Sequence, residues 1–160
     1  LKLRLENFEK IVPNLKKISE IAKEETKVEL HKGKRVYRTL LKDMVATLKK
    51  NETTYLIGID EDVLLNEVEP IYLKQYLNII NSKNIKEKII NKIGSKKLKH
   101  ENLQYKELDK KYIGKTSQII YNNKVAIFIL GTPYYLVIID NEEVAETYKK
   151  QFVLLCSIAK

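Results

Sequence analysis

Residues 117–160 read SQIIYNNKVAIFILGTPYYLVIIDNEEVAETYKKQFVLLCSIAK, and this stretch decides the fold class. Three runs rich in β-branched and aromatic residues predict strands, at residues 119–121, 125–130 and 134–139. Asn122-Asn123 is the two-residue turn between the first two strands, because asparagine tolerates the positive φ that hairpin turns require. The stretch therefore predicts a β-hairpin region that leads into a closing helix.

The closing helix has a clear start signal and one apolar face. Asp140 and Glu143 have the spacing of a capping box. The apolar face comprises Val144, Tyr148, Phe152, Leu155 and Ala159. Cys156, the single cysteine, lies in this helix, where we interpret it as a small buried hydrophobe rather than a reactive thiol. A lone cysteine forms no intrachain disulfide, which favours a reducing, cytoplasmic location.

Upstream of this stretch, predicted strands and helices alternate. Strands are expected at residues 26–31, 53–59, 85–93 and 103–108, helices at 34–50 and 69–81, and a short basic helical turn around 96–101. Asn51 in the left-handed conformation closes the first of these helices. Pro70 lies in the first turn of the second, where its missing N–H costs nothing. The alternation predicts one α/β domain over residues 26–160, with a mixed sheet flanked by helices.

Residues 1–25 are predicted to form a separate helix with a heptad seam. The seam positions recur at alternating steps of four and three: Leu1, Leu5, Phe8, Val12, Leu15 and Ala22. Pro13 lies within the stretch, so we expect a kink or a restart there. Since a heptad seam is buried best against another helix, we predict a linker and dimerisation helix that pairs through Leu5, Phe8, Val12 and Leu15. The alternative is an ordinary amphipathic helix packed on its own domain.

Length and composition are those of a globular protein. The 160 residues are 44% apolar and 32% charged, which excludes a disordered chain and suits one domain. The longest apolar stretch, residues 125–139, is interrupted by Gly131-Thr132-Pro133 and is too short to span a bilayer as a helix. We expect no contact with a membrane.

Positive charge is concentrated in one run. The net charge is +9, and residues 83–100 contain seven lysines against a single acid, Glu87. A face of this kind attracts phosphate backbones or acidic ligands. The run contains neither arginine nor an aromatic residue, so a solvated lysine-rich surface is the other interpretation.

Few residues suggest catalysis or a metal. His31 and His100 have no paired histidine or cysteine close by in the sequence, so no zinc spacing exists. Gly33-Lys34 precedes a helix without the second glycine and the Ser/Thr of a phosphate-binding loop, although the amides of that helix start could hold an anion. We interpret the carboxylates of residues 60–62 as a solvated acidic turn, and we predict neither a metal nor a cofactor.

Several segments together resemble the effector half of archaeal TrmB-like transcriptional regulators. They are the heptad-bearing first helix, VELHKGKRVYRTLL (28–41), YLIGID (55–60), NNKVAIFIL (122–130) and AETYKKQFVLLCSIAK (145–160). In that family a winged helix-turn-helix precedes a coiled-coil linker helix and a phospholipase-D-like α/β domain. The resemblance implies a phospholipase-D-like mixed sheet, and DNA contacts made through an upstream winged helix that is not part of this chain. The chain departs from the family at Val36, where a second glycine is common, and at Cys156, near a frequent tryptophan.

The resemblance also implies which chemistry is missing. Phospholipase-D-type enzymes carry a His, a Lys two residues later and an Asp five residues further on, before the strand that residues 125–130 resemble. With the Asp position set on Asn122, the His position is Lys115 and the Lys position is Ser117. An ammonium cannot replace the imidazole nucleophile, and an amide cannot replace its carboxylate partner. We therefore predict no phosphodiesterase activity.

These observations favour the ligand-sensing and dimerisation domain of a TrmB-like regulator, acting as a homodimer. An unidentified small-molecule effector would bind at the carboxyl ends of the strands, near Lys115, Ser117, Asn122 and Asp60. Two alternatives stay open. One is a stand-alone nucleic-acid-binding protein that uses the lysine-rich run, and the other is a hydrolase with residual phosphodiesterase activity.

Overall fold

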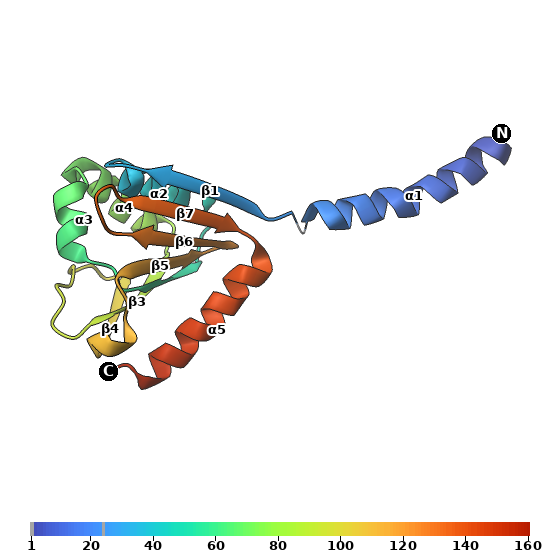
Figure 1. Ribbon diagram of the computed structural model, residues 1–160. Coiled ribbons are helices and arrows are strands. Elements are labelled where there is room, and N and C mark those ends of the chain that lie inside the picture. Colours follow the sequence, from blue (N-terminus) through green and yellow to red (C-terminus); the bar gives the residue numbers. More distant parts are fainter. Residues whose placement is uncertain (1, 24) are drawn as a thin grey trace.

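A long helix projects from an α/β domain in the computed structural model, which describes residues 2–23 and 25–160 (Figure 1). In α1 the side chains are described at residues 2, 5 and 9–17. The helices are α1 (Lys2–Lys23), α2 (Val36–Thr47), α3 (Glu61–Glu67), α4 (Pro70–Ser82), the short 3-10 helix η1 (Lys110–Tyr112) and α5 (Glu142–Ile158). The strands are β1 (Lys27–Lys32), β2 (Thr53–Ile57), β3 (Lys86–Lys92), β4 (Leu103–Leu108), β5 (Thr116–Tyr121), β6 (Lys124–Ile129) and β7 (Tyr135–Asp140).

The seven strands form one mixed sheet in the order β1-β7-β6-β5-β2-β3-β4. The pairs β2–β3 and β3–β4 are parallel, and the other neighbours are antiparallel. The β5–β6 hairpin turns at Asn122, whose φ of 50° confirms the predicted turn. The mixed α/β fold is therefore as predicted.

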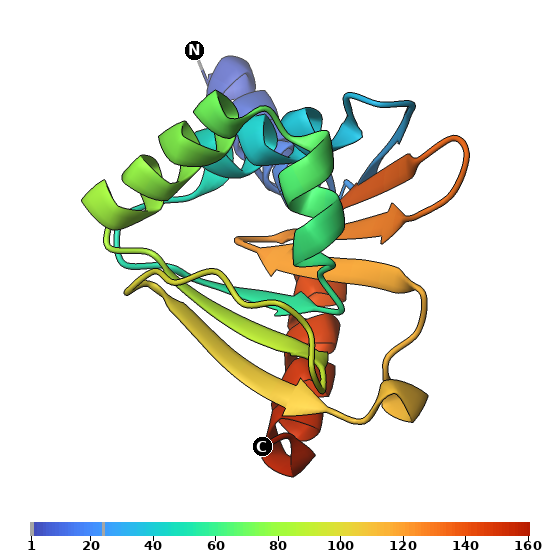
Figure 2. The same cartoon turned by 90° about the vertical axis from the view of Figure 1, so that its left-hand side faces the viewer.

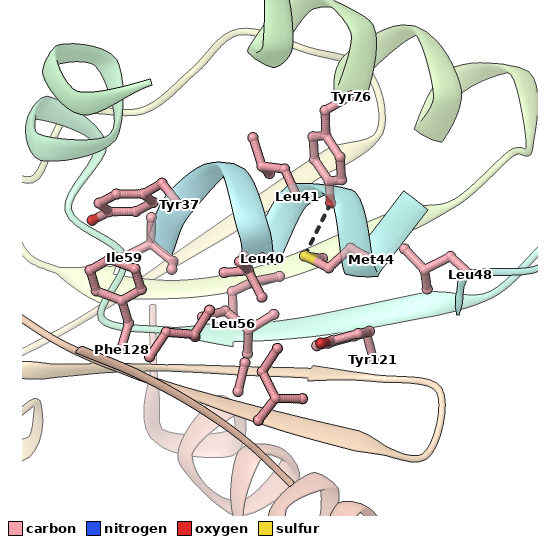
Figure 3. Packing of buried hydrophobic residues seen from close by; sticks show 14 of the residues in the cluster. Tyr37, Leu40, Leu41, Met44, Leu48, Leu56, Ile59, Tyr76, Tyr121 and Phe128 are labelled. Atoms are coloured by element: carbon pink, nitrogen blue, oxygen red, sulfur yellow. Dashed lines mark hydrogen bonds between the residues drawn. The ribbon is translucent and has the colours of Figure 1, made fainter. Parts of the chain in front are cut away.

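Each face of the sheet is covered by different helices (Figures 1 and 2). Alternate residues of a strand point to opposite faces, so Leu56 packs under α2 and α4 whereas Ile57 packs under α5. Figure 3 shows the first layer, in which Met44 of α2 and Tyr76 of α4 meet above Tyr121 and the sheet. The rings of Tyr37 and Phe128 lie 4.0 Å apart, centroid to centroid. This packing fixes α2 and α4 on the sheet and leaves α3 at the carboxyl ends of β2 and β3.

Helix α1 extends away from the domain (Figure 1). It is 22 residues long and runs through Pro13, so the predicted restart at that residue is wrong. Leu5 and Leu15 are each 58% exposed, and Val12 is 36% exposed. The side chain of Phe8 lies outside the described residues. No described side chain of α1 belongs to either core cluster.

The structure corrects two predicted helix ends. Helix α2 ends at Thr47, and Asn51, with φ of 63°, lies in the following turn rather than at the helix end. The N-cap of α5 is Asn141, whose side chain accepts from the Val144 N–H at 3.0 Å. Asp140 cannot be the cap because it ends β7 and pairs with both Lys27 and Lys124. Asp140 therefore belongs to β7, and the next residue, Asn141, caps α5.

Two further predictions fail for short segments. Residues 96–101 form no helix and run as an irregular loop. The acidic residues 60–62, predicted as a solvated turn, begin the seven-residue helix α3.

Cys156 is half-buried beside the α5 cluster rather than fully buried. None of the helices described has the length and apolar character needed to cross a membrane.

Candidate functional site

A cavity of about 150 Å³ lies at the carboxyl ends of the parallel strands β2 and β3. We call it the carboxyl-end cleft. One wall is formed by residues 58–62 after β2, and the other by Lys92 and residues 94–96 after β3. Gly58 has φ of 70°, and its N–H donates to the Ile90 carbonyl at 2.9 Å. Carboxyl ends of strands are where open α/β sheets hold ligands.

The first wall is acidic because α3 begins there. The Asp60 carboxylate caps the helix by accepting from the N–H groups of Asp62 and Val63, each at 3.1 Å. Asp60 is exposed, and its carboxylate is already bonded to the backbone at the start of α3. Within the described parts of the chain, no group of three histidine, cysteine or acidic side chains is arranged to hold a metal ion.

Glu61 differs from its acidic neighbours because its side chain is only 3% exposed. It lines both the cleft and an inner apolar cavity of about 60 Å³ under α2 and α4. Its Oε1 accepts from the Tyr105 hydroxyl at 2.7 Å, whereas its Oε2 is buried with no hydrogen-bond partner among the described residues. Burial raises the pKa of Glu61, and the charges of Asp60 and Asp62 add to the increase. The cleft therefore contains a carboxyl group with unused hydrogen-bonding capacity.

The second wall is basic. Lys92 ends β3, and Lys96 lies 3.3 Å from Asp62 through its Nζ, as an exposed ion pair across the mouth of the cleft. Gly94, with φ of 82°, allows the tight turn in which the Ser95 N–H donates to the Lys92 carbonyl at 3.0 Å. The turn places an ammonium and a hydroxyl-bearing residue on one wall.

The sequence-predicted site residues do not all meet. Asp60 lines the cleft. Ser117 is 2% exposed and donates from its Oγ to the Gly58 carbonyl at 2.8 Å, so it holds the backbone of a residue that lines the cleft. Lys115 is exposed immediately before β5, at the same end of the sheet. Asn122 lies at the opposite end, where its Nδ2 donates to Glu52 Oε1 at 2.7 Å. The predicted grouping of Asn122 with the others is corrected, because an extended strand carries the two ends of the motif apart.

The two histidines lie away from the cleft. His31 Nε2 lies 3.0 Å from Glu29 Oε2 on β1. His100 Nδ1 accepts from the Asn102 N–H at 3.3 Å. Neither histidine lines the cleft, so the imidazole that phospholipase-D-type chemistry uses is not present there.

The lysine-rich run does not form one continuous basic face. Lys83 donates to the carbonyls at the end of α2, at 2.7 Å to Leu48 and 3.0 Å to Val45. Lys96 and Lys97 form ion pairs with acids. Glu87, the only acid of the run, is 4% exposed and accepts from the hydroxyls of Tyr76 and Thr54. Burial raises the pKa of Glu87 to about 7. The run thus divides between structural and solvated lysines.

Sequence reasoning found the acidic triplet but missed Glu61, Lys92 and Ser95 as cleft residues. The acidic cluster itself was the available signal for Glu61. Its burial, however, depends on Tyr105, which lies 44 positions later in the chain. Lys92 lies near the end of a predicted strand and Ser95 follows that strand, and only the parallel pairing of β2 with β3 places them opposite residues 60–62.

No protein-family model matches the sequence, and no curated protein matches it at the level of sequence. The fold is similar to that of TrmBL2, an archaeal chromatin protein whose structure shows a novel mode of DNA binding (TM-score 0.57, 18% identity). That similarity covers 99% of this chain and 64% of TrmBL2, so the chain spans less than two thirds of that protein.

Two further solved structures are also similar. NucT from Helicobacter pylori has a TM-score of 0.60 and 15% identity, over 84% of this chain and 98% of that protein. Nuc from Salmonella typhimurium, a phospholipase D family member, has a TM-score of 0.58 and 12% identity, over 85% and 97%. The chain therefore has a TrmB-like, phospholipase-D-like fold, which occurs both in a chromatin protein and in a phospholipase D family member.

Proposed function

We propose that the chain is the ligand-sensing and dimerisation domain of a TrmB-like transcriptional regulator and has no phosphodiesterase activity. The observation that carries this proposal is α1, which leaves the domain with its apolar seam uncovered (Figure 1). A regulator needs such a helix to join two effector domains and to fix the spacing of two DNA-reading domains. DNA would be contacted by a winged helix upstream of Leu1.

The occupant of the seam is a second copy of α1. Leu5, Val12 and Leu15 follow the heptad spacing, and each is exposed in the single chain. Burying apolar surface contributes about 25 cal/mol per Å², so an uncovered seam several turns long favours association. Two identical heptad helices bury the same positions against each other around a two-fold axis.

Sedimentation analysis of the whole chain tests the dimer. We expect a dimer that becomes a monomer in the Leu5→Glu/Leu15→Glu double variant, because two carboxylates would enter each seam. Asn14→Glu adds a carboxylate on the exposed opposite face of the same helix and should leave the dimer intact. A monomeric wild-type chain at high concentration would contradict the proposal.

The carboxyl-end cleft is the proposed effector site. Asp60 lines it and Lys115 lies at the same end of the sheet, while Ser117 holds the Gly58 carbonyl beneath it. Asn122 is left out of the site because it is bonded to Glu52 at the other end.

The absence of phosphodiesterase activity is tested with bis(p-nitrophenyl) phosphate. We expect no turnover by the chain at any pH, since no imidazole lines the cleft. Asn122→Asp restores one carboxylate of the enzyme motif, and we expect it to remain inactive. Turnover that disappears in Lys115→Ala would instead support the hydrolase alternative.

One alternative has a specific observation in its favour. The net charge of +9 and the DNA binding of TrmBL2 are consistent with direct contact between this domain and nucleic acid. Lys86, Lys88 and Lys99 are the exposed lysines of the run that form no ion pair with any described side chain. Binding of a labelled DNA duplex by the chain alone, with a steep dependence on salt that falls in Lys86→Ala/Lys88→Ala, would favour this alternative.

A further inference from the structure

The two walls of the carboxyl-end cleft carry opposite charges that are not matched within the cleft. The pair between Lys96 and Asp62 leaves Glu61 and Asp60, whose carboxylate caps α3, on one wall and Lys92 on the other. No ion pair formed by the described side chains involves Glu61 or Lys92. The cleft thus offers an unmatched carboxyl group and an unmatched ammonium, with space between them.

Glu61 is the buried acid of the cleft. A carboxyl group that is 3% exposed ordinarily has hydrogen-bond partners on both oxygens, because an unmade hydrogen bond is costly in a buried setting. The Tyr105 hydroxyl satisfies Oε1, and Oε2 has no described partner. A ligand that brings positive charge beside Glu61 would favour the ionised carboxylate.

Lys92 sets the opposite requirement. Lys92 is half-buried at the end of β3, and Ser95, which follows the turn at Gly94, lines the same wall. An ammonium and a neighbouring hydroxyl are donors that suit a carboxylate. The charges also exclude other classes of ligand. A phosphate would face the acidic wall, a simple cation would leave Lys92 unmatched, and a neutral polyol would match neither charge.

We propose that the carboxyl-end cleft binds a small zwitterion, a molecule with an ammonium and a carboxylate a few bonds apart, such as an α-amino acid. The ammonium lies against Glu61 and the carboxylate against Lys92 and Ser95. The cavity of about 150 Å³ limits the ligand to a small one, since a cavity of similar volume holds benzene. This inference rests on the proposed function of the cleft as an effector site, and it names the chemical class of the effector.

The first experiment measures thermal unfolding and calorimetric binding with matched probes. The zwitterions are glycine, L-alanine, L-serine, β-alanine and γ-aminobutyrate, tested singly on the whole chain. Ethylamine and propionate carry the two charges separately, and glucose is the neutral polyol. We expect at least one zwitterion to bind and raise the melting temperature, and to bind at least about tenfold more tightly than either half-ligand.

Variants then locate the binding. Glu61→Gln keeps the shape of the side chain and its acceptor for Tyr105 but removes the charge, and Lys92→Ala removes the opposite charge. Each should weaken zwitterion binding by about tenfold or more. Glu67→Gln at the other end of α3, and Lys88→Ala four residues before Lys92 on β3, make the same charge changes away from the cleft and should leave binding unchanged.

Three results would overturn the inference. They are no effect of any zwitterion, binding of ethylamine or propionate as tightly as the zwitterions, and zwitterion binding that survives both Glu61→Gln and Lys92→Ala. If glucose bound and Glu61→Gln abolished that binding, the cleft would still be an effector site and only the ligand class would be wrong. The dimer is measured on the same samples, so a monomeric chain that binds zwitterions would contradict the dimerisation and leave this inference standing.

Discussion

The two ends of β2 and β3 both collect polar side chains, but they use them differently. At the amino end, Glu52 accepts from the Lys49 N–H at 2.8 Å and from Asn122 Nδ2 at 2.7 Å, and Asn84 donates to Asn51 at 2.8 Å. At the carboxyl end, the side chains surround a cavity, and an oxygen of Glu61 has no described partner. Polar groups bonded to each other hold a structure together, whereas unmatched groups around a cavity remain free to bind a ligand.

Two buried carboxyl groups give the same contrast. Glu87, near the amino end of β3, accepts from Tyr76 and Thr54 through its Oε1. Glu61, at the carboxyl end, accepts from Tyr105 and from no other described residue. Burial raises the pKa of both groups, so burial alone does not distinguish a structural residue from a functional one. The two groups differ instead in the number of their hydrogen-bond partners.

The largest expected effect concerns Glu87 and pH. Below pH 4.5, its usual pKa, the group is protonated in both the folded and the unfolded chain. Between pH 4.5 and about 7 the unfolded chain releases this proton while the folded chain keeps it, so stability falls as pH rises, by about 3 kcal/mol in total. Glu87→Gln should remove this part of the loss.

Urea unfolding over a pH series measures the difference between wild type and Glu87→Gln. The variant should gain stability relative to wild type as pH rises through the window and keep this gain above it. Glu61, whose pKa is also raised, contributes in the same direction and remains in both proteins, so it cancels in the comparison. A difference that does not change with pH would show that Glu87 is ionised in the fold.

The next effect concerns the amino end. Glu52→Ala leaves the Lys49 N–H and the Asn122 amide without their acceptor, and we expect a loss of about 1–3 kcal/mol in the free energy of unfolding. Glu69→Ala is the control, because Glu69 is exposed and its side chain makes no cap hydrogen bond. Equal stability of the two variants in urea would show that the hydrogen bonds of Glu52 do not stabilise the amino end of β2 and β3.

A smaller effect on stability is expected at Ser117, which bonds the cleft-lining residue Gly58. Ser117→Ala removes the hydrogen bond to the Gly58 carbonyl, which should cost about 1 kcal/mol. Ser157→Ala removes a bond of an exposed hydroxyl to its own helix and serves as the control, since water replaces it. If Ser117→Ala were as stable as wild type but lost ligand binding, Ser117 would belong to the cleft rather than to its support.

The smallest effect concerns the wall of the cleft. Lys92 forms no ion pair with the described acids, so Lys92→Ala should lie within about 0.5 kcal/mol of wild type in thermal unfolding without ligand. A clear destabilisation would show that Lys92 has a structural role in the empty protein. It would also weaken the assignment of its ammonium to a ligand.

Much of the fold was readable from local pattern. β-branched runs predicted β2, β3 and β5 to β7 because a half-buried strand selects these residues wherever it occurs. Pro70 and Asn122 predicted a helix start and a turn because the backbone preferences of proline and asparagine are intrinsic to these residue types. Helix α3 was missed since seven residues are too few for a periodic pattern, and its start was interpreted as a turn.

The candidate site was less predictable. Spacing along the chain grouped Lys115, Ser117 and Asn122, but a strand rises about 3.3 Å per residue, so seven residues separate its ends by roughly 20 Å. Asp60 was found because it follows a strand, whereas Glu61 gave no signal that distinguishes it from Asp60 and Asp62. Which of the three acids is buried depends on how α3 packs toward Tyr105.

The sequence by itself determined the mixed α/β class and the helical first segment with its heptad spacing, because both rest on residue types and short spacings. Only the tertiary structure decided that Asn122 faces away from the cleft, that the lysine-rich run is divided, and that Glu61 and Lys92 lie on opposite walls. These depend on the parallel pairing of β2 with β3 and on the antiparallel pairing of β2 with β5. Strand pairing joins residues far apart in the chain, and local pattern carries no information about that partner.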